Sequence, residues 1–189
     1  MKICFICSNL WPHTLGGAER RYYEFARELM ARGHDVVYIT YGWGPSEVPT
    51  IPLGPPPRLY NGEGHRRFIP ALTFGIKAAK AAGKANCDVI DATVPYTEIP
   101  HLPPHRTILT MHEIWGPMWR EYYGPLAGAL VARAEKWILK KPAAVVVPTE
   151  VVARKARGVR PDVEVVPFGI RPEDYLPYRS PEKIYDAAA

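Results

Sequence analysis

Glutamine is absent from this 189-residue sequence, and asparagine occurs only at Asn9, Asn61 and Asn86. These amides are among the side chains least stable at high temperature, and extra proline in loops is another common adaptation to heat. The chain also contains 21 prolines. The composition therefore indicates a thermophilic source.

Cysteine is scarce as well, with three residues in the chain, which argues against a scaffold held together by several disulfides. Cys4 and Cys7 form a C-x-x-C pattern inside a nearly continuous apolar run. Residues three apart on a strand point to opposite faces, so this pair is poorly placed to share a metal or a redox bond. We expect buried strand thiols rather than zinc or redox chemistry.

No segment approaches the roughly 18 consecutive apolar residues of a membrane-spanning helix, and the N-terminus lacks the pattern of a signal peptide. The net charge is +5, which favours anionic ligands or an anionic surface. The basic residues form no dense cluster, so nucleic acid is not an expected partner. Segment 66–84 fits either a buried helix with solvated lysines or a contact with anionic lipid. We expect a cytoplasmic protein, with the inner face of the membrane as a peripheral contact.

Several short motifs with a defined chemistry are missing. The sequence has no G-x-G-x-x-G, no glycine followed by Lys-Ser or Lys-Thr, and no G-x-S-x-G, which argues against a dinucleotide fingerprint, a P-loop and a nucleophile elbow. It has no Asp-x-Asp, the simplest pattern for a divalent metal that holds a diphosphate. His101 and His105 have the spacing of two metal ligands on a helix, but the two prolines between them are incompatible with a helix. No metal and no resident cofactor are expected.

A pair of glycines separates the first expected strand from the first expected helix. Residues 2–7 are almost continuously apolar, as in a buried parallel strand, and residues 18–32 have the periodicity of an amphipathic helix that Gly33 is suited to end. Gly16 and Gly17 leave room for a ligand beside the backbone, and the helix start offers free N–H groups and a positive dipole end to an anion. The alternative is a tight turn in which Glu19 complements the helix dipole.

Strands and helices alternate along the rest of the chain. We expect strands at 36–40, 89–93, 107–111, 144–147 and 163–166, and helices at 70–84, 125–140 and 149–156, the last capped by Thr149. Residues 42–67 contain six prolines between Pro45 and Pro57, so we expect a surface excursion with one short strand near 58–60. The pattern predicts an α/β fold with a Rossmann-like doubly wound parallel sheet. In helix 125–140, the side chains expected to face inward are Leu126, Leu130, Ala134, Trp137 and Ile138.

Polar residues follow two of the expected strands, at the edge where open parallel sheets bind ligands. His112 and Glu113 follow strand 107–111, and Tyr96 follows strand 89–93. Each is a candidate contact for a ligand, with a loop or packing role as the alternative. Five large side chains come next and fit either a core cluster or a surface that stacks on sugars: Trp115, Met118, Trp119, Tyr122 and Tyr123.

Taken in order, these segments resemble the N-terminal domain of glycosyltransferase family 4 enzymes, which have the GT-B fold. The matching segments are 16–20 (GGAER), 31–36 (ARGHDV), 88–92 (DVIDA), 110–113 (TMHE), 144–149 (AVVVPT) and 163–170 (VEVVPFGI). The last of them resembles the family's crossover into its second domain, although Phe168 stands where asparagine is common. The resemblance covers the chain to about residue 172.

The resemblance implies the acceptor-side half of a nucleotide-sugar-dependent glycosyltransferase of hexosyl type that is retaining and independent of metal. By their positions in the motifs, Gly16 and Gly17 would approach the donor diphosphate and His112 would be the catalytic residue facing the transferred sugar. Glu19 and Arg20 would border the acceptor side, with Tyr96 and Glu113 as further sugar contacts.

The expected partners are the nucleotide sugar, a glycan, lipid or small-molecule acceptor, and the protein's own C-terminal domain. Residues 1–172 would form the N-terminal domain and residues 173–189 the start of the crossover. The family's donor-binding glutamate pair and basic pair have no counterpart in the sequence, so we expect the chain alone to be inactive. The alternatives are an epimerase of the same architecture, in which His112 and Glu113 act on the sugar, and a non-catalytic module that binds phosphorylated ligands.

Overall fold

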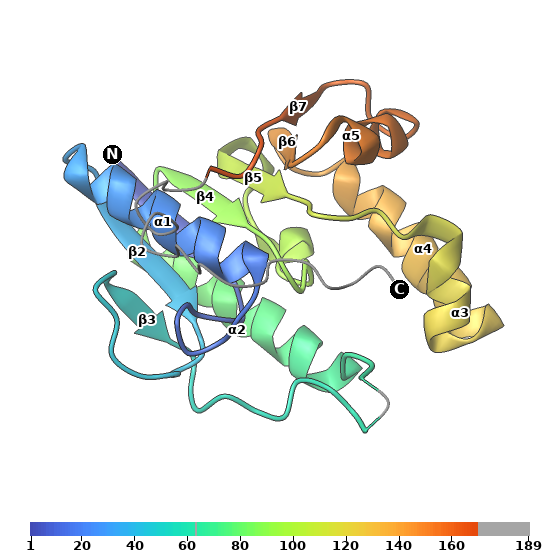
Figure 1. Ribbon diagram of the computed structural model, residues 1–189, viewed down its shortest axis with the longest axis horizontal. Coiled ribbons are helices and arrows are strands. Elements are labelled where there is room, and N and C mark those ends of the chain that lie inside the picture. The colour runs from blue at the N-terminus through green and yellow to red at the C-terminus, as the bar shows by residue number, and fades with distance from the viewer. Residues whose placement is uncertain (63, 170–189) are drawn as a thin grey trace, which may run out of the picture.

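The computed structural model describes residues 1–62 and 64–169, and its centre is a parallel β-sheet (Figure 1). Within these residues the sheet has seven strands in the order β3-β2-β1-β4-β5-β6-β7, and every neighbouring pair is parallel. This confirms the predicted Rossmann-like sheet. The strands are β1 (Lys2–Ile6), β2 (Asp35–Thr40), β3 (Thr50–Pro52), β4 (Val89–Ala92), β5 (Thr107–Thr110), β6 (Ala144–Val147) and β7 (Val163–Val165).

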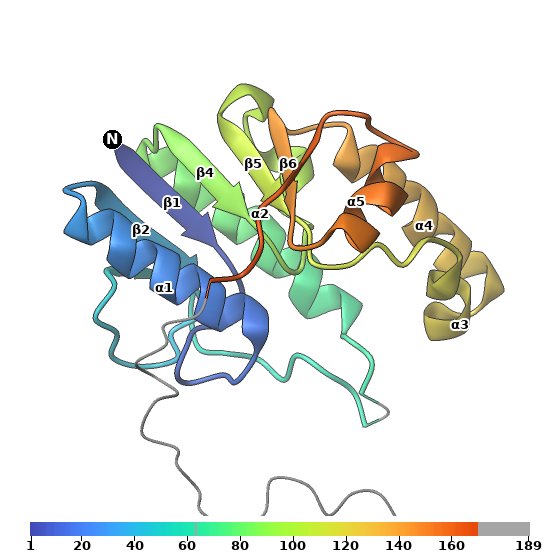
Figure 2. The same ribbon diagram turned by 45° about the horizontal axis from the view of Figure 1, so that its top comes forward.

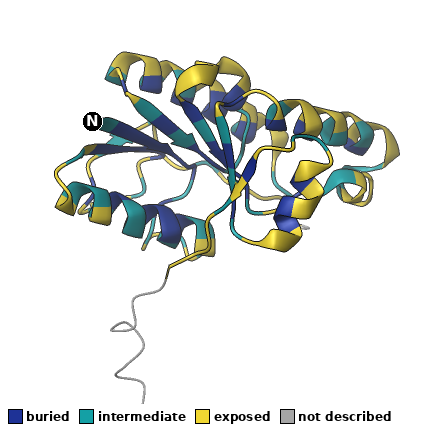
Figure 3. Cartoon of the chain, turned by 90° about the horizontal axis from the view of Figure 1, so that it is seen from above, coloured by how far each residue is buried: buried dark blue, intermediate teal, exposed yellow. Residues whose placement is uncertain are grey.

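Helices cover both faces of this sheet. They are α1 (Gly17–Ala31), α2 (Phe68–Ala85), α3 (Trp119–Tyr123), α4 (Pro125–Leu139) and α5 (Glu150–Arg157), with short 3-10 turns η1 (Ile99–His101), η2 (Pro104–Arg106) and η3 (Gly116–Met118). Figure 2 shows α1 and α2 on opposite faces. Along β1, Cys4 and Ile6 belong to the apolar layer that includes α2, whereas Ile3 and Phe5 belong to the layer under α1. Figure 3 shows the buried strands between helices whose outer sides are exposed. Burial on both faces explains the continuous apolar runs.

Two predicted helix boundaries are confirmed in detail. Gly33 follows α1 with φ +82°, the left-handed conformation that ends a helix at little steric cost. The side chain of Thr149 accepts a hydrogen bond from the backbone N–H of Val152 at 3.3 Å, so it caps α5. The domain boundary expected at residue 172 lies outside the described residues.

The proline-rich excursion contains a strand, but not where we expected it. The strand is β3 at Thr50–Pro52, on the edge of the sheet beside β2, whereas residues 58–60 contribute only an isolated antiparallel bridge between Tyr60 and Arg66. An edge strand tolerates proline because one of its sides needs no partner. The excursion therefore extends the sheet and then returns across the carboxyl ends of its strands.

The orientation predicted for helix 125–140 is wrong for most of its side chains. Leu126, Leu130 and Trp137 are 83%, 71% and 46% exposed, and Ala134 is exposed as well. Ile138 is the member of the expected stripe that packs against the core. The helix instead buries Gly128, Glu135 and Leu139. A Cβ at Gly128 would overlap the backbone of Trp119 and Arg120, so a close crossing of α3 and α4 sets the orientation.

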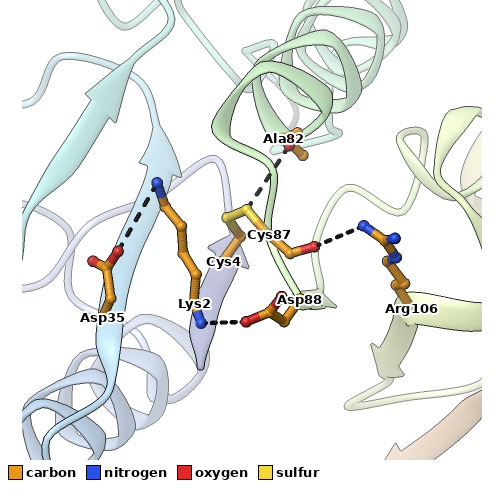
Figure 4. Close-up of a disulfide and its surroundings, with 7 residues drawn as sticks. All are labelled: Lys2, Cys4, Asp35, Ala82, Cys87, Asp88 and Arg106. Atoms are coloured by element: carbon orange, nitrogen blue, oxygen red, sulfur yellow. Dashed lines mark hydrogen bonds and ion pairs between the residues drawn. A yellow bond between two sulfur atoms is a disulfide. The ribbon is translucent and has the colours of Figure 1, made fainter.

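The expectation that Cys4 and Cys7 are both buried strand thiols is wrong for Cys4. Cys4 on β1 and Cys87 directly after α2 form a disulfide with a Cα–Cα distance of 5.9 Å (Figure 4). Parallel pairing of β1 with β4 brings the end of α2 beside β1, since Ile3 pairs with Val89. Cys7 remains a free, buried thiol. A separation of 83 residues gives no local sequence signal for this bond.

Candidate functional site

A pocket of about 320 Å3 lies at the carboxyl ends of the central strands. Residues that follow β1, β4, β5 and β6 line it, together with the first turn of α1. Figure 2 shows β1 and β4 pointing toward the end of the molecule at which α1 begins. A second hollow of about 350 Å3 shares Asn9, Glu19 and Tyr60 with the first. Open parallel sheets bind ligands in this kind of crevice.

The two glycines at the start of α1 serve different purposes. Gly17 is exposed and lines the pocket, and a Cβ there would meet only a ring carbon of Phe168 at 3.9 Å. Gly16 is the N-cap with extended backbone, and a Cβ there would collide with the carboxylate of Glu19. Gly16 thus makes room for Glu19, while Gly17 keeps the helix start open. The free N–H groups and the positive end of the α1 dipole face this space.

Glu19 is a buried carboxylate at the junction of the two hollows. Glu19 is only 7% exposed, and its Oε1 accepts a hydrogen bond from Nδ2 of Asn9 at 2.6 Å. Arg20, the next residue, lines neither hollow, and its guanidinium lies 5.4 Å from the centre of the Trp11 ring. Of the two predicted acceptor-side residues, Glu19 therefore lies at the pocket and Arg20 does not.

His112 lines the same pocket as Gly17. Burial lowers the pKa of its imidazole to about 4, and the nearby guanidinium of Arg21 acts in the same direction. The ring is 5.3 Å from the ring of Phe168, and neither ring nitrogen has a hydrogen-bond partner among the described residues. A neutral imidazole offers one donor and one acceptor, which suits the hydroxyl groups of a ligand.

The other two predicted contacts lie outside both hollows. Tyr96 has a left-handed backbone (φ +69°) and packs against the apolar layer, where burial raises the pKa of its hydroxyl. Glu113 is exposed, and its Oε2 accepts a hydrogen bond from Nε1 of Trp115 at 2.7 Å. The structure therefore brings together Gly17, Glu19 and His112.

The aromatic cluster after His112 supports the pocket rather than lining it. Trp115 stacks on Trp119 with a centroid distance of 4.9 Å, and Trp119 stacks on Tyr123 at 5.7 Å. The carboxylate of Glu135 on α4 accepts hydrogen bonds from the backbone N–H of Trp115 (3.1 Å), the backbone N–H of Gly116 (2.8 Å) and Nε1 of Trp119 (2.9 Å). These contacts favour the packing interpretation of the cluster.

Sequence reasoning named no residue of the proline-rich excursion as a contact, although the excursion supplies one side of the pocket. Tyr60 and Arg66 line the pocket and pair with each other through the isolated bridge. Tyr122 and Tyr123 of α3 hold this segment: the backbone N–H of Arg66 donates to the Tyr122 hydroxyl at 2.7 Å, and the Tyr123 hydroxyl donates to the Arg66 carbonyl at 3.0 Å. No motif in residues 42–67 indicates this arrangement.

Across residues 1–62 and 64–169, no group of three or more His, Cys, Asp and Glu side chains is arranged to hold a metal ion. In the same part of the chain, none of the helices has both the length and the apolar character needed to cross a bilayer.

A parallel sheet in this order, with a pocket against the start of α1, defines a Rossmann-like α/β domain. The sequence profile of Glycosyltransferase Family 4 matches residues 15–174, and the chain belongs to this family. No curated protein sequence matches it significantly.

The chain is similar to two solved structures of sugar-transferring enzymes. One is sucrose-phosphate synthase from Thermosynechococcus elongatus, with a TM-score of 0.61, 16% identity, and coverage of 91% of this chain and 49% of that one. Another is the glycosyltransferase SsfS6 of Streptomyces sp. SF2575, with a TM-score of 0.43, 14% identity, and coverage of 78% and 50%. The first likeness confirms the Rossmann-like half of a GT-B fold. The chain spans about half the length of these structures.

Proposed function

We propose that this chain forms one wall of the active site of a nucleotide-sugar-dependent glycosyltransferase of hexosyl type, retaining and independent of metal. A C-terminal domain would form the opposite, donor-binding wall. The observation that carries the proposal is the shared pocket of Gly17 and His112 at the start of α1. Family membership favours sugar transfer over the epimerase and binding-module alternatives.

Sugar transfer from a nucleotide diphosphate requires stabilisation of the negative charge that grows on the leaving phosphate. Prealigned N–H groups supply this, and removal of one such donor costs about 3 kcal/mol in a comparable oxyanion site. In this proposal the first turn of α1 at Gly17 meets the diphosphate, with cations of the second wall completing the site. Backbone donors and cations then do the work that a metal ion does in other transferases.

His112 and Glu19 would act on the sugar side of the same pocket. The neutral imidazole of His112 would hold a hydroxyl of the transferred sugar, with Phe168 fixing the ring from one side. The Glu19 carboxylate, which accepts a hydrogen bond from Asn9, would contact a hydroxyl of the acceptor. Each wall would hold part of the reacting pair, so the 189-residue chain alone is proposed to be inactive.

Substitution of Gly17 by Val is expected to weaken binding of UDP-glucose or GDP-mannose at least tenfold, because a branched side chain would cover the open N–H groups of α1. The dissociation constant would be measured by NMR titration, with the wild-type shifts centred on Gly17 and Ala18. Gly83→Val is the matched control, since a Cβ at Gly83 meets nothing within 4 Å and Gly83 lies at the end of α2 that leads to the amino end of β4, away from the pocket.

Two results would contradict the proposal. If nucleotide sugars shift no amide near Gly17, the diphosphate site is wrong. If the 189-residue chain transfers sugar with robust turnover, the requirement for a second wall is wrong. Formation of an epimer instead of a transfer product would select the epimerase alternative.

We also propose that α2 rests on an anionic membrane surface. Its N-terminal half exposes Phe68 (57%), Ile69 (73%), Leu72 (40%) and Ile76 (56%). The helix contains three lysines and no acidic residue. An exposed apolar face flanked only by positive charge complements anionic lipid, and would place the protein at the inner face of the membrane.

The double substitution Leu72→Ser and Ile76→Ser is expected to reduce binding to phosphatidylglycerol-containing vesicles at least tenfold in a co-sedimentation assay. The matched control is Leu126→Ser with Leu130→Ser on α4, whose side chains are 83% and 71% exposed. Equal loss in both double variants, or equal binding to vesicles of neutral phosphatidylcholine, would refute the membrane contact.

A further inference from the structure

Arg66 places a positive charge in the pocket without an acidic partner. Its Nη2 donates to the Ser8 hydroxyl at 2.5 Å, its guanidinium carbon is 5.8 Å from the centre of the Tyr60 ring, and its buried Nε has no hydrogen-bond partner. Among residues 1–62 and 64–169, no carboxylate lies within ion-pair distance of it. A guanidinium has five N–H donors in a planar fork, so most of this donor capacity is free.

The main chain of Arg66 is fixed independently of its side chain. The side-chain hydroxyls of Tyr122 and Tyr123 bind its N–H and its carbonyl, and an isolated bridge pairs it with Tyr60 earlier in the excursion. The next residue, Arg67, donates its N–H to the carbonyl of Leu59 at 2.8 Å. The backbone that carries the guanidinium is therefore held in place before a ligand binds, which lowers the entropy cost of binding.

Neither of the two acids nearest the pocket forms an ion pair with Arg66. Glu98 lies close enough to interact with the guanidinium, but burial raises the pKa of its carboxyl to about 8, so it is mostly neutral at pH 7. Glu19 lines the pocket but binds Asn9. Anions bind strongly to a partly desolvated guanidinium, often through two parallel hydrogen bonds.

We propose that Arg66, with Ser8 and Tyr60, forms a subsite for the anionic group of the acceptor: a phosphate or carboxylate on a molecule that also carries hydroxyl groups. This assignment rests on the proposed function, in which the acceptor enters the pocket beside Glu19 and His112. The start of α1 at Gly17 remains the site of the donor diphosphate. The anion comes either from a soluble phosphorylated molecule or from a lipid headgroup.

NMR titration of the 189-residue chain with glycerol 3-phosphate tests the soluble source. Shifts are expected at Ser8, Tyr60 and Arg66, and glycerol, which lacks the anion, is expected to give none. Arg66→Gln should weaken binding at least tenfold, whereas Arg67→Gln, which removes an exposed charge next in sequence, should leave it unchanged. The bonds from Tyr122 and Tyr123 reach the backbone, so Arg66→Gln keeps them. A thermal melt confirms that both variants are folded, and Arg66→Lys should bind with intermediate affinity.

Nanodiscs containing phosphatidylglycerol test the lipid source with the same two variants. Binding that depends on Arg66 in either arm supports the subsite and identifies the source. Shifts that map only to the lysines of α2, or binding that Arg66→Gln leaves intact in both arms, would overturn it. So would a loss of UDP-glucose binding in Arg66→Gln with no change for glycerol 3-phosphate, because Arg66 would then serve the donor. Failure of UDP-glucose to bind the wild type, with glycerol 3-phosphate still bound at Arg66, would count against the proposed function alone.

Discussion

Loss of the Cys4–Cys87 disulfide is expected to lower the free energy of unfolding by about 4 kcal/mol. The bond closes a loop of 83 residues that contains α1, the proline-rich excursion and α2. In the chain-entropy account, a cross-link over a loop of this length removes much of the freedom of the unfolded chain. Chemical unfolding of the oxidised wild type and of a Cys4→Ala/Cys87→Ala variant would measure the difference.

Cys7→Ala is the matched control for this measurement. It removes a buried thiol from the same strand region without breaking a cross-link, so it isolates the cost of the lost side chain. Reductant should destabilise the wild type and leave the double variant unchanged. If reductant does not change the free energy of unfolding of the wild type, the disulfide does not stabilise the fold. Disulfides persist inside cells chiefly in hyperthermophiles, so a stabilising bond would fit the cytoplasmic location expected from the sequence together with the thermophilic source expected from composition.

The sheet was predictable because local and global signals agree there. Apolar runs marked the strands, Gly33 marked the end of α1, and Thr149 marked the start of α5. The orientation of α4 was not predictable, since a helix is normally assumed to bury its most apolar stripe. Here a close crossing at Gly128 and the hydrogen bonds of Glu135 determine which face is inward. Both depend on segment 115–123, which includes α3 and whose position the sequence pattern does not reveal.

Some residues of the candidate site were likewise predictable from the sequence, and others were not. Gly17 was predicted because a glycine pair begins a helix there. His112 was predicted because it follows a strand, and parallel strands end at one edge of the sheet. The same rule also selected Tyr96 and Glu113, which lie outside both hollows, because position after a strand does not fix the direction of a side chain. Arg66 was not predicted as a pocket residue. It lies in the proline-rich excursion, and Tyr122 and Tyr123 hold its backbone at the pocket. Contacts over such long separations have no periodic signal in the sequence.

Glu98 connects the stability of the fold to the charge of the pocket. Its side chain is fully buried at the start of η1, and neither carboxylate oxygen has a well-formed hydrogen bond. Burial raises the pKa of its carboxyl to about 8 from an ordinary value of 4.5, and the backbone amides of Glu98 and Tyr96 and the Arg66 guanidinium oppose the shift only in part. Between pH 4.5 and about 8, the Glu98 carboxyl is therefore protonated in the folded protein and ionised in the unfolded chain.

The sign of the resulting pH dependence follows from proton binding. A carboxyl whose pKa is higher in the folded state stabilises the fold fully below pH 4.5 and loses that contribution as pH rises through about 8. Asp91, with a carboxyl pKa raised to about 6 by burial, acts in the same direction at lower pH. His112, with its pKa lowered to about 4, acts in the opposite direction below its ordinary value of 6.5. Among these three groups, Glu98 alone titrates between pH 6.5 and pH 8.

Glu98→Gln is consequently expected to abolish most of the decline in stability above pH 6.5. The wild type should lose up to about 1.4 kcal/mol of unfolding free energy per pH unit in this window, because a difference of one bound proton between the folded and unfolded states gives that slope. The variant keeps the shape of the protonated acid and has no proton to lose, so its chemical unfolding curve should be nearly independent of pH there. Glu164→Gln, on the exposed side of β7, should retain the wild-type slope. Equal slopes in wild type and Glu98→Gln would mean that Glu98 is ionised in the fold, and Arg66 would then have the acidic neighbour that an anion subsite must lack.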